Sequence, residues 1–309
     1  MADTRTPDAR TRSEPGALFS LRSRRTRRRR RIAGTTPLPP PFTNILCAVD
    51  GSRSSAEAVR QAVALCGPAT ALGFVAVTNT VGQDLSAQAD LSEQRARAAL
   101  DDAAGCAKQA GIRALTGLRR SARVSDQLLA ESADHDLLAI GCHGATRLGG
   151  MMLGSTATQI AHRAETPLLI ARRSIDGDQF PTDILLATDG SPGSWAAART
   201  AARLARARAS ALRMVYVPDG HPERYRELFK QQSAIERMIG SPPDFVDVPG
   251  EPARRIVEAA QAGQSSLIVT SKRGLRGVEA LGSVSERIVH RAPCSVLVIP
   301  SAPALEALD

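Results

Sequence analysis

The chain has 309 residues, of which 43% are hydrophobic, enough for about two domains with cores of their own. Most of its net charge of +9 lies in residues 1–41, which hold eleven Arg and three acidic residues, so the rest of the chain is nearly neutral. That distribution argues against a dedicated nucleic-acid-binding fold, and no run of 18 apolar residues predicts a membrane span. Five widely spaced cysteines without a C-x-x-C pair predict neither a disulfide framework nor a structural zinc site, which favours a cytoplasmic protein.

The first segment, residues 1–41, is expected to be a disordered tail. Eight of the ten residues from Arg22 to Arg31 are Arg, and their mutual repulsion opposes a compact state. Two interpretations stay open, namely an arm that binds polyanions and a solvated leader without a function of its own. A second, short tail is expected at residues 303–309.

From residue 42 onward, short apolar runs alternate with helical patterns. The expected strands lie near residues 44–50, 71–77, 112–118, 137–140 and 168–171. The expected helices begin near Ser54, with Ser54 and Glu57 as a capping box, and then cover about residues 85–110, 125–133 and 155–164. Apolar strands without polar alternation, each followed by a helix, indicate βαβ units and a parallel sheet.

The same order recurs in the second half of the chain. Residues 154–164 and 282–292 align without a gap, and their Gly, Ser, Ile, His, Arg and Ala residues are identical in register. Ser191 is expected to cap the first helix of this half, with Pro192 at its first position. The sequence therefore predicts a tandem duplication with a first domain at 42–173, a linker at 174–181 and a second domain at 182–302.

A glycine-rich loop follows the fourth strand of the first half and ends at Gly154-Ser155-Thr156, where a helix opens. Free N–H groups and the positive dipole end of a helix suit a phosphate, and ligands of open parallel sheets bind at the carboxyl ends of the strands. The alternative is a loop that only turns the chain. Neither the P-loop pattern nor G-x-G-x-x-G is present.

Other polar residues of these loops leave two interpretations each. Asp50 and Asp189, which end the first strand of each half, either face a ribose hydroxyl or a metal, or form a turn that leads into the helix. His143 is interpreted as a spacer rather than an acid or base, because no carboxylate partner is evident. Cys142 is interpreted as a small buried residue rather than a reactive thiol.

The spacing Gly141-x2-Gly144-x9-Gly154-Ser155 resembles the signature of the universal stress protein family. The likeness extends to Ala-Val-Asp-Gly-Ser at residues 48–52 and to the closing Ala-Pro-Cys-Ser-Val-Leu-Val-Ile-Pro at 292–300, and covers about residues 42–300. It implies an α/β fold of two tandem Rossmann-like domains, each with a five-stranded parallel sheet of order 3-2-1-4-5 flanked by helices. It also implies that last strands pair, residues 168–171 with 296–299, within the chain or in a homodimer.

The resemblance further implies a nucleotide site, because ATP lies across the strand ends in the nucleotide-binding members. Carried onto this chain, the expected site residues are Ala48, Asp50, Val77, Gly141, Gly144, Gly154, Ser155 and Thr156. ATP is the expected cofactor, with or without Mg²⁺. A second site, expected to be weaker, would use Asp189, Val217, Gly274, Gly282, Ser283 and Val284. Its first glycine is replaced by Ser271, and only seven residues separate Gly274 from Gly282.

Three functions stay open at this point: an ATP-binding regulatory stress-response protein with little turnover, a weak ATPase or autokinase, and a nucleotide-free protein-interaction module. The first-half loop offers no P-loop Lys, carboxylate or general base, so no enzyme, catalytic residue or metal site is expected. The expected partner is an adenine nucleotide. No membrane contact is expected, and any contact with nucleic acid is expected only through the Arg-rich tail.

Overall fold

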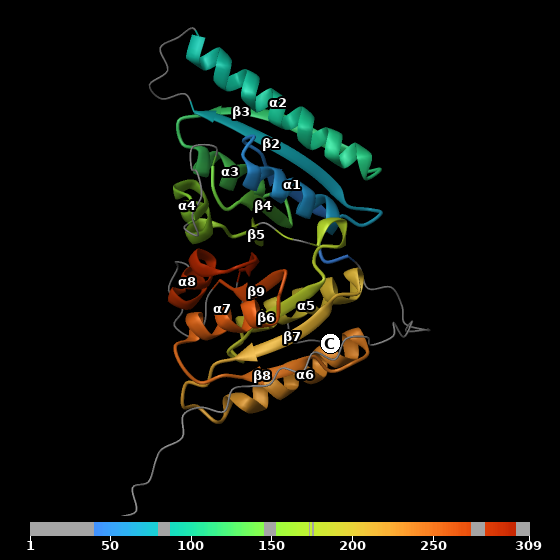
Figure 1. Ribbon diagram of the computed structural model, residues 1–309, viewed down its shortest axis with the longest axis vertical. Helices are drawn as coiled ribbons and strands as arrows, with labels where there is room; N and C mark the ends of the chain where they lie inside the picture. Colours follow the sequence, from blue (N-terminus) through green and yellow to red (C-terminus); the bar gives the residue numbers. More distant parts are fainter. Residues whose placement is uncertain are drawn as a thin grey trace, which may run out of the picture. The chain divides into compact units, whose positions relative to one another are not determined.

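The computed structural model describes residues 40–79, 87–144, 153–172, 174, 176–272 and 282–300 (Figure 1). Its first half consists of β1 (Asn44–Ala48), α1 (Arg53–Leu65), β2 (Ala71–Asn79), α2 (Ala87–Gln109), β3 (Ala114–Ser121), α3 (Val124–Ser132), β4 (Leu137–Gly141), α4 (Ser155–Arg163) and β5 (Leu168–Ala171). A short 3-10 turn, η1 (Gly177–Gln179), leads to the second half. That half consists of β6 (Asp183–Ala187), α5 (Ser194–Arg208), β7 (Ala211–Tyr216), α6 (Arg224–Ile239), β8 (Asp244–Asp247), α7 (Pro252–Ala262), β9 (Leu267–Ser271), α8 (Ser283–Arg291) and β10 (Ser295–Ile299).

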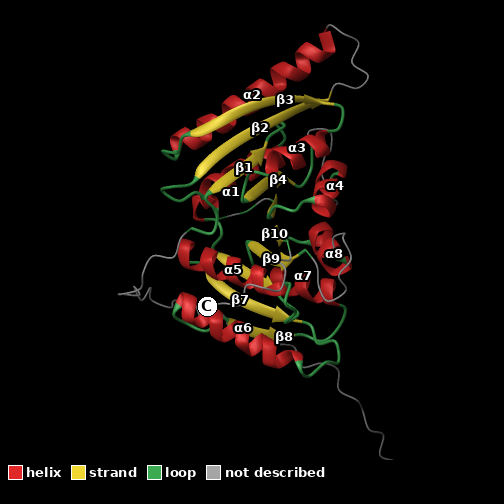
Figure 2. Cartoon of the chain, turned by 180° about the vertical axis from the view of Figure 1, so that it is seen from behind, coloured by secondary structure: helices red, strands yellow, loops and turns green. Residues whose placement is uncertain are grey.

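All ten strands belong to one sheet, in the order β3-β2-β1-β4-β5-β10-β9-β6-β7-β8 (Figure 2). Every described pairing within a half is parallel, and each half has the order 3-2-1-4-5. The predicted fold, two tandem Rossmann-like α/β domains, is confirmed. Because parallel strands all point one way, the loops that follow β1, β2 and β4 meet at a single edge, where ligands of this architecture bind.

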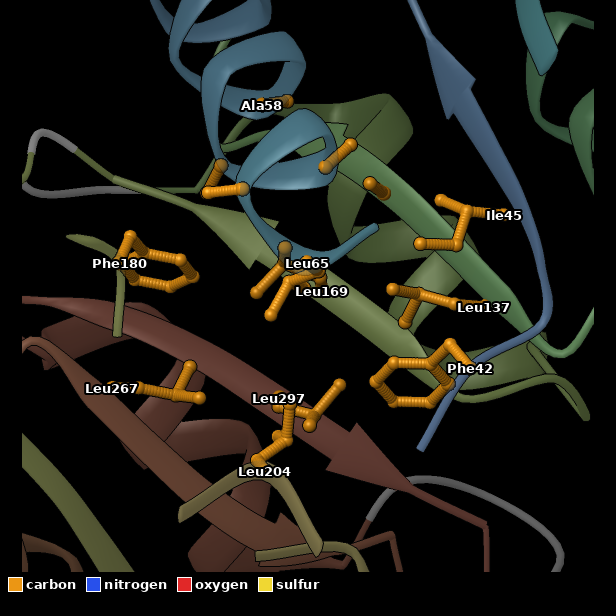
Figure 3. Close-up of a cluster of buried hydrophobic side chains, with 14 of the residues drawn as sticks. Phe42, Ile45, Ala58, Leu65, Leu137, Leu169, Phe180, Leu204, Leu267 and Leu297 are labelled. Carbon is orange, nitrogen blue, oxygen red and sulfur yellow. The ribbon is translucent and has the colours of Figure 1, made fainter. Parts of the chain in front are cut away.

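The two halves join through an antiparallel pairing of β5 with β10, in which Leu169 faces Leu297. We call this junction the seam. One hydrophobic cluster crosses it and includes Phe42, Leu65, Leu169, Phe180, Leu204, Leu267 and Leu297 (Figure 3). The expected pairing of the last strands is therefore present within the chain, and both halves share a core.

Buried polar side chains also cross the seam. Gln61 of α1 donates from Nε2 to the Arg172 carbonyl at 2.8 Å, and its Oε1 accepts from the Ser295 hydroxyl at 2.8 Å. Glu57 accepts from the same Gln61 amide at 2.9 Å and from the Ser174 backbone at 3.2 Å. Since a buried polar group without a partner is costly, these satisfied groups fix the register of the seam and the start of the linker.

Two expected helix starts are wrong. The cap of α1 is Ser52, whose hydroxyl accepts from the Ser55 amide at 3.1 Å. Ser54 is not the cap, because its hydroxyl contacts the loop after β4 instead. Helix α5 begins at Ser194 with Gly193 as its cap, and the Ser191 carbonyl accepts from the Ser194 amide in a preceding turn.

Some expectations fall outside the described residues. They concern the tail up to residue 39, the loop stretch 145–152, Gly274 and the residues beyond 300. The last residues before the first strand do contact the fold, since the Pro40 carbonyl accepts from Arg203 of α5 at 2.9 Å. Among the described helices, none is long and apolar enough to cross a bilayer.

Leu297→Ala tests the seam. Leu297 is fully buried where β5 meets β10, so its truncation should lower the free energy of unfolding by about 2–5 kcal/mol. Chemical denaturation followed by circular dichroism measures this loss. Leu115→Ala is the matched control, because Leu115 is 81% exposed and the same truncation there should cost less than about 0.5 kcal/mol. Equal losses of unfolding free energy in the two variants would contradict a stabilising role of the seam.

Candidate functional site

A cavity of about 390 Å³ opens at the carboxyl ends of β1, β2 and β4 and is bounded by α3 and α4. The structure brings all eight residues predicted for the first site into its lining: Ala48, Asp50, Val77, Gly141, Gly144, Gly154, Ser155 and Thr156. These residues come from four separate segments of the chain. Their convergence follows from the strand order, which places β4 directly beside β1.

The cavity also has an apolar wall that the sequence argument missed. It is formed by Val75 of β2, Val124 and Leu128 of α3, Ile140 of β4 and Ile160 of α4. Val124 and Leu128 are four residues apart and share one helix face, which is the signal that would have indicated them. The lining therefore combines polar groups of backbone and side chains with an aliphatic surface, as suits a ligand with a flat apolar part and an anionic part.

Gly141, at the end of β4, is required by a close approach of α1. A Cβ there would lie 2.7 Å from the carbonyl carbon and the hydroxyl of Ser54 and 2.7 Å from the Ser55 amide. No larger residue fits without moving the start of α1. The glycine thus places the cavity floor next to the first turn of α1.

The loop after β4 is tied to α1 through His143. Its amide donates to the Ser54 hydroxyl at 3.2 Å, and its carbonyl accepts from the hydroxyls of Ser52, at 3.3 Å, and of Ser54. The backbone of His143 therefore anchors the start of the glycine-rich loop, and both serines of the Asp-Gly-Ser-x-Ser stretch serve that anchor.

Asp50 forms the turn that was one of its two expected roles. Its Oδ1 accepts from the Ser52 amide at 2.9 Å, and its own amide donates to the Ser55 hydroxyl at 3.1 Å. The side chain still lines the cavity, and a Cβ on Gly144 would lie 3.4 Å from Asp50 Oδ2. Turn formation and ligand contact are thus compatible at this residue.

Two helices direct their N-termini at the cavity. The cap of α4 is Gly154, which has no side chain to satisfy the first-turn amides, and the cap of α3, Arg123, makes no side-chain cap bond. The Gly154 amide itself donates to the Cys142 carbonyl at 2.9 Å, which holds α4 against the end of β4. Uncapped N-termini with positive dipole ends favour an anion in the cavity.

Charged side chains contribute little to the lining. Asp50 is the one acidic or basic residue among the described lining residues apart from the ring of His143. Burial raises the pKa of the Cys142 thiol, with the Arg172 guanidinium opposing that rise in part, so the thiol stays neutral and is a poor nucleophile. Within the described ranges, no group of three or more His, Cys, Asp or Glu side chains is placed to hold a metal ion.

The described residues at the equivalent place in the second half differ from those of the first. Ser271 stands where the first half has Gly141, and its carbonyl accepts from the Ser285 hydroxyl at 2.8 Å. Both serines are buried. Gly193 stands where the first half has Ser54. The anion-binding end of α7 is occupied, because Glu251 caps it and accepts from the Arg254 amide at 2.8 Å.

Of the residues predicted for the second site, Asp189 repeats the turn of Asp50, with Oδ1 accepting from the Ser191 amide at 3.0 Å. Val217 is buried after β7, and Gly282 caps α8, whose first residues are Ser283 and Val284. Gly274 lies outside the described residues.

Comparison with known proteins identifies this arrangement. The sequence model of the universal stress protein family matches twice, at residues 41–172 and 182–300. The chain belongs to the universal stress protein family. The two matches coincide with the two halves of the sheet, as the duplication in the sequence predicts.

Individual universal stress proteins show how far the likeness extends. One from Mycolicibacterium smegmatis is 28% identical over 288 residues, which are 82% of this chain and 96% of that protein. One from Methanocaldococcus jannaschii is 31% identical over 144 residues, which are 40% of this chain and 85% of that protein. The crystal structure of a universal stress protein from Archaeoglobus fulgidus superposes with a TM-score of 0.71 at 20% identity, covering 84% of this chain and 98% of that chain, and shows the shared fold.

Gly141→Ala tests the close approach beneath the cavity. The added Cβ meets backbone atoms that cannot move independently, so we expect a loss of about 1–3 kcal/mol in the free energy of unfolding. Gly105→Ala in α2 is the matched control, because a Cβ there meets nothing within 4 Å and alanine should stabilise the helix by about 0.5–1 kcal/mol. Thermal melts of both variants decide the matter. An unchanged melting temperature for Gly141→Ala would mean that α1 is free to shift.

Proposed function

We propose that the first half of this universal stress protein binds an adenine nucleotide, with ATP as the expected ligand, and serves as a regulatory binding protein in the stress response. The observation that supports this most is that one cavity is lined by the full glycine pattern, by an aliphatic wall and by the uncapped start of α4. Its volume of about 390 Å³ is of the size found for small-molecule sites.

The proposed pose follows from the chemistry of the lining. The adenine ring packs against the aliphatic wall near Val77, and the ribose lies beside Asp50 and the glycines at the end of β4. The phosphates lie beside Gly154, Ser155 and Thr156, where the first-turn N–H groups of Ser155 and Thr156 and their two hydroxyls are available as donors. Each part of the ligand thereby faces a surface of matching polarity.

Mg²⁺ fits this site only together with the nucleotide. Mg²⁺ is commonly held by one or two carboxylates plus substrate phosphates, and Asp50 is the one carboxylate in the described lining. The protein would supply that single oxygen ligand and the phosphates the others. Mg²⁺ would there neutralise phosphate charge.

Binding without rapid turnover is the expected behaviour. Phosphoryl transfer requires cationic side chains around the γ-phosphate and a group that orients the nucleophile. The described lining has no Lys or Arg, and donors of the backbone bind phosphate in the ground state as well as in a transition state. The weak ATPase or autokinase is therefore the less favoured proposal, and the nucleotide-free module is the other alternative.

Gly154→Asp tests the phosphate position. A Cβ on Gly154 meets its neighbours at 3.5 Å or more, so the variant should fold, and an Asp cap favours the helix. Its carboxylate would occupy the place of the phosphate, so ATP affinity should fall at least tenfold in calorimetry. Gly154→Ala is the control, with the same Cβ but no charge, and should stay within about threefold of the unmodified protein. Equal affinities of all three proteins would contradict the proposed pose.

The second half should bind nucleotide weakly or not at all. Ser271 replaces the glycine of the first half, the buried Ser285 hydroxyl donates to its carbonyl, and Glu251 already caps α7. We therefore expect about one ATP per chain. Gly282→Asp should leave both the stoichiometry and the affinity unchanged, whereas two equal sites, or a loss of binding in Gly282→Asp alone, would reverse the assignment of the halves.

The Arg-rich tail is proposed as the one part of the chain that binds polymeric anions such as nucleic acid or heparin. Deleting residues 1–36 leaves Pro40 and its contact with Arg203 intact, so ATP affinity and melting temperature should not change. Retention on heparin should be lost, because it would depend on counterion release by the arginines. Retention of the truncated protein at the same salt concentration would place the basic surface on the folded body.

A further inference from the structure

Two buried cations cross the seam in opposite directions. Lys272, 4% exposed at the end of β9, donates from Nζ to the Ala164 carbonyl at the end of α4, at 2.7 Å. Arg172, 7% exposed after β5, donates from Nη2 to the Val289 carbonyl in the last turn of α8, at 2.7 Å. Each half therefore places a cation at the C-terminus of a helix in the other half.

These buried contacts contribute more to stability than ion pairs at the surface do. The last four carbonyls of a helix have no partner within the helix, and the macrodipole makes that end negative. A buried ammonium or guanidinium without compensation is strongly destabilising, so both groups are held to these carbonyls. The positions of the helix ends and of the cations are thus fixed together.

Lys272 occupies a special place in this arrangement. Its carbonyl accepts from the Gly282 amide, the cap of α8, at 2.8 Å, and its amide donates to the Ile299 carbonyl at 2.6 Å. Cys142 makes the same two backbone bonds in the first half, to Gly154 and to Ala171. Only the residue of the second half has a long cationic side chain, and that side chain spans the seam.

We propose that Lys272 is a positioning residue for phosphate binding in the first half. The helix that it holds, α4, begins at Gly154, Ser155 and Thr156, where the proposed function, on which this inference rests, places the phosphates. A helix of nine residues is a rigid rod about 13 Å long, so holding its C-terminus also fixes the direction of its N-terminus. The second half thereby completes the ligand site of the first.

The test compares ATP with adenosine. Lys272→Met keeps the aliphatic stem but removes the charge and the donor. With the Lys272 contact to the C-terminal end of α4 lost, ATP affinity measured by calorimetry should fall about tenfold, whereas adenosine, which has no phosphate to reach α4, should bind within about twofold of the unmodified protein. Lys272→Arg keeps charge and donors and should restore most of the preference for ATP.

Two controls separate positioning from general destabilisation. Arg172→Met removes the equivalent buried contact on α8 and should lower the melting temperature comparably, while the ratio of ATP to adenosine affinity stays unchanged. Lys230→Met removes an exposed lysine paired with Glu227 and should change neither quantity. A fall in the ratio for Arg172→Met as large as for Lys272→Met would mean that loss of seam stability, not placement of α4, is responsible.

A measurement on the unmodified protein decides the matter even if Lys272→Met does not fold. ATP, but not adenosine, should slow amide hydrogen exchange in the last turn of α4 and at the end of β9. Unchanged exchange at the end of β9 with ATP bound, or an unchanged affinity ratio in folded Lys272→Met, overturns the inference. Failure of the unmodified protein to bind any adenine nucleotide would instead refute the proposed function.

Discussion

The pairing of β5 with β10 is the contact on which the rest of this structure depends. A parallel sheet of order 3-2-1-4-5 ends in a strand whose outer N–H and C=O groups have no partner, and such an edge pairs readily with another chain. Tandem duplication satisfies it within the molecule, because the equivalent edge strands of the two halves pair with each other. The pairing is antiparallel and places Leu169 opposite Leu297.

The shared seam changes what each half has to supply. Both halves contribute to one hydrophobic cluster, so neither needs a complete core of its own. Because the core is shared, the sequences of the two halves are able to differ. In the first half, Gly141 lies against Ser54 and leaves a cavity open. In the second half the two residue types are exchanged, with Ser271 at the position of Gly141 and Gly193 at the position of Ser54. At this helix start of the second half, the Ser285 hydroxyl donates to the Ser271 carbonyl.

The sequence predicts the fold, and the convergence of the eight first-half residues on one cavity, because both depend on strong local signals. Short apolar runs without alternation predict buried parallel strands, and the structure has them at 137–141 and 168–171. The glycine spacing identifies backbone that lines the cavity. Helix starts were less predictable, since several serines follow each Asp-Gly and the turn geometry decides which of them caps the helix. The cationic contacts of Arg172 and Lys272 leave no local signal, because their partners are carbonyl groups more than 100 residues away in sequence.

A site that relies on backbone donors is sensitive to geometry rather than to charge. An Arg or Lys attracts phosphate over a distance of several ångströms, whereas an N–H group acts only within a narrow range of distance and angle. With no cationic side chain in its described lining, the cavity depends on where α4 points, and therefore on what holds both ends of α4. The Cys142 carbonyl holds one end from within the first half, and Lys272 holds the other from the second. The two halves are thus unequal in a specific way: the first carries the described cavity, and the second, through Lys272, contacts the helix that bounds it.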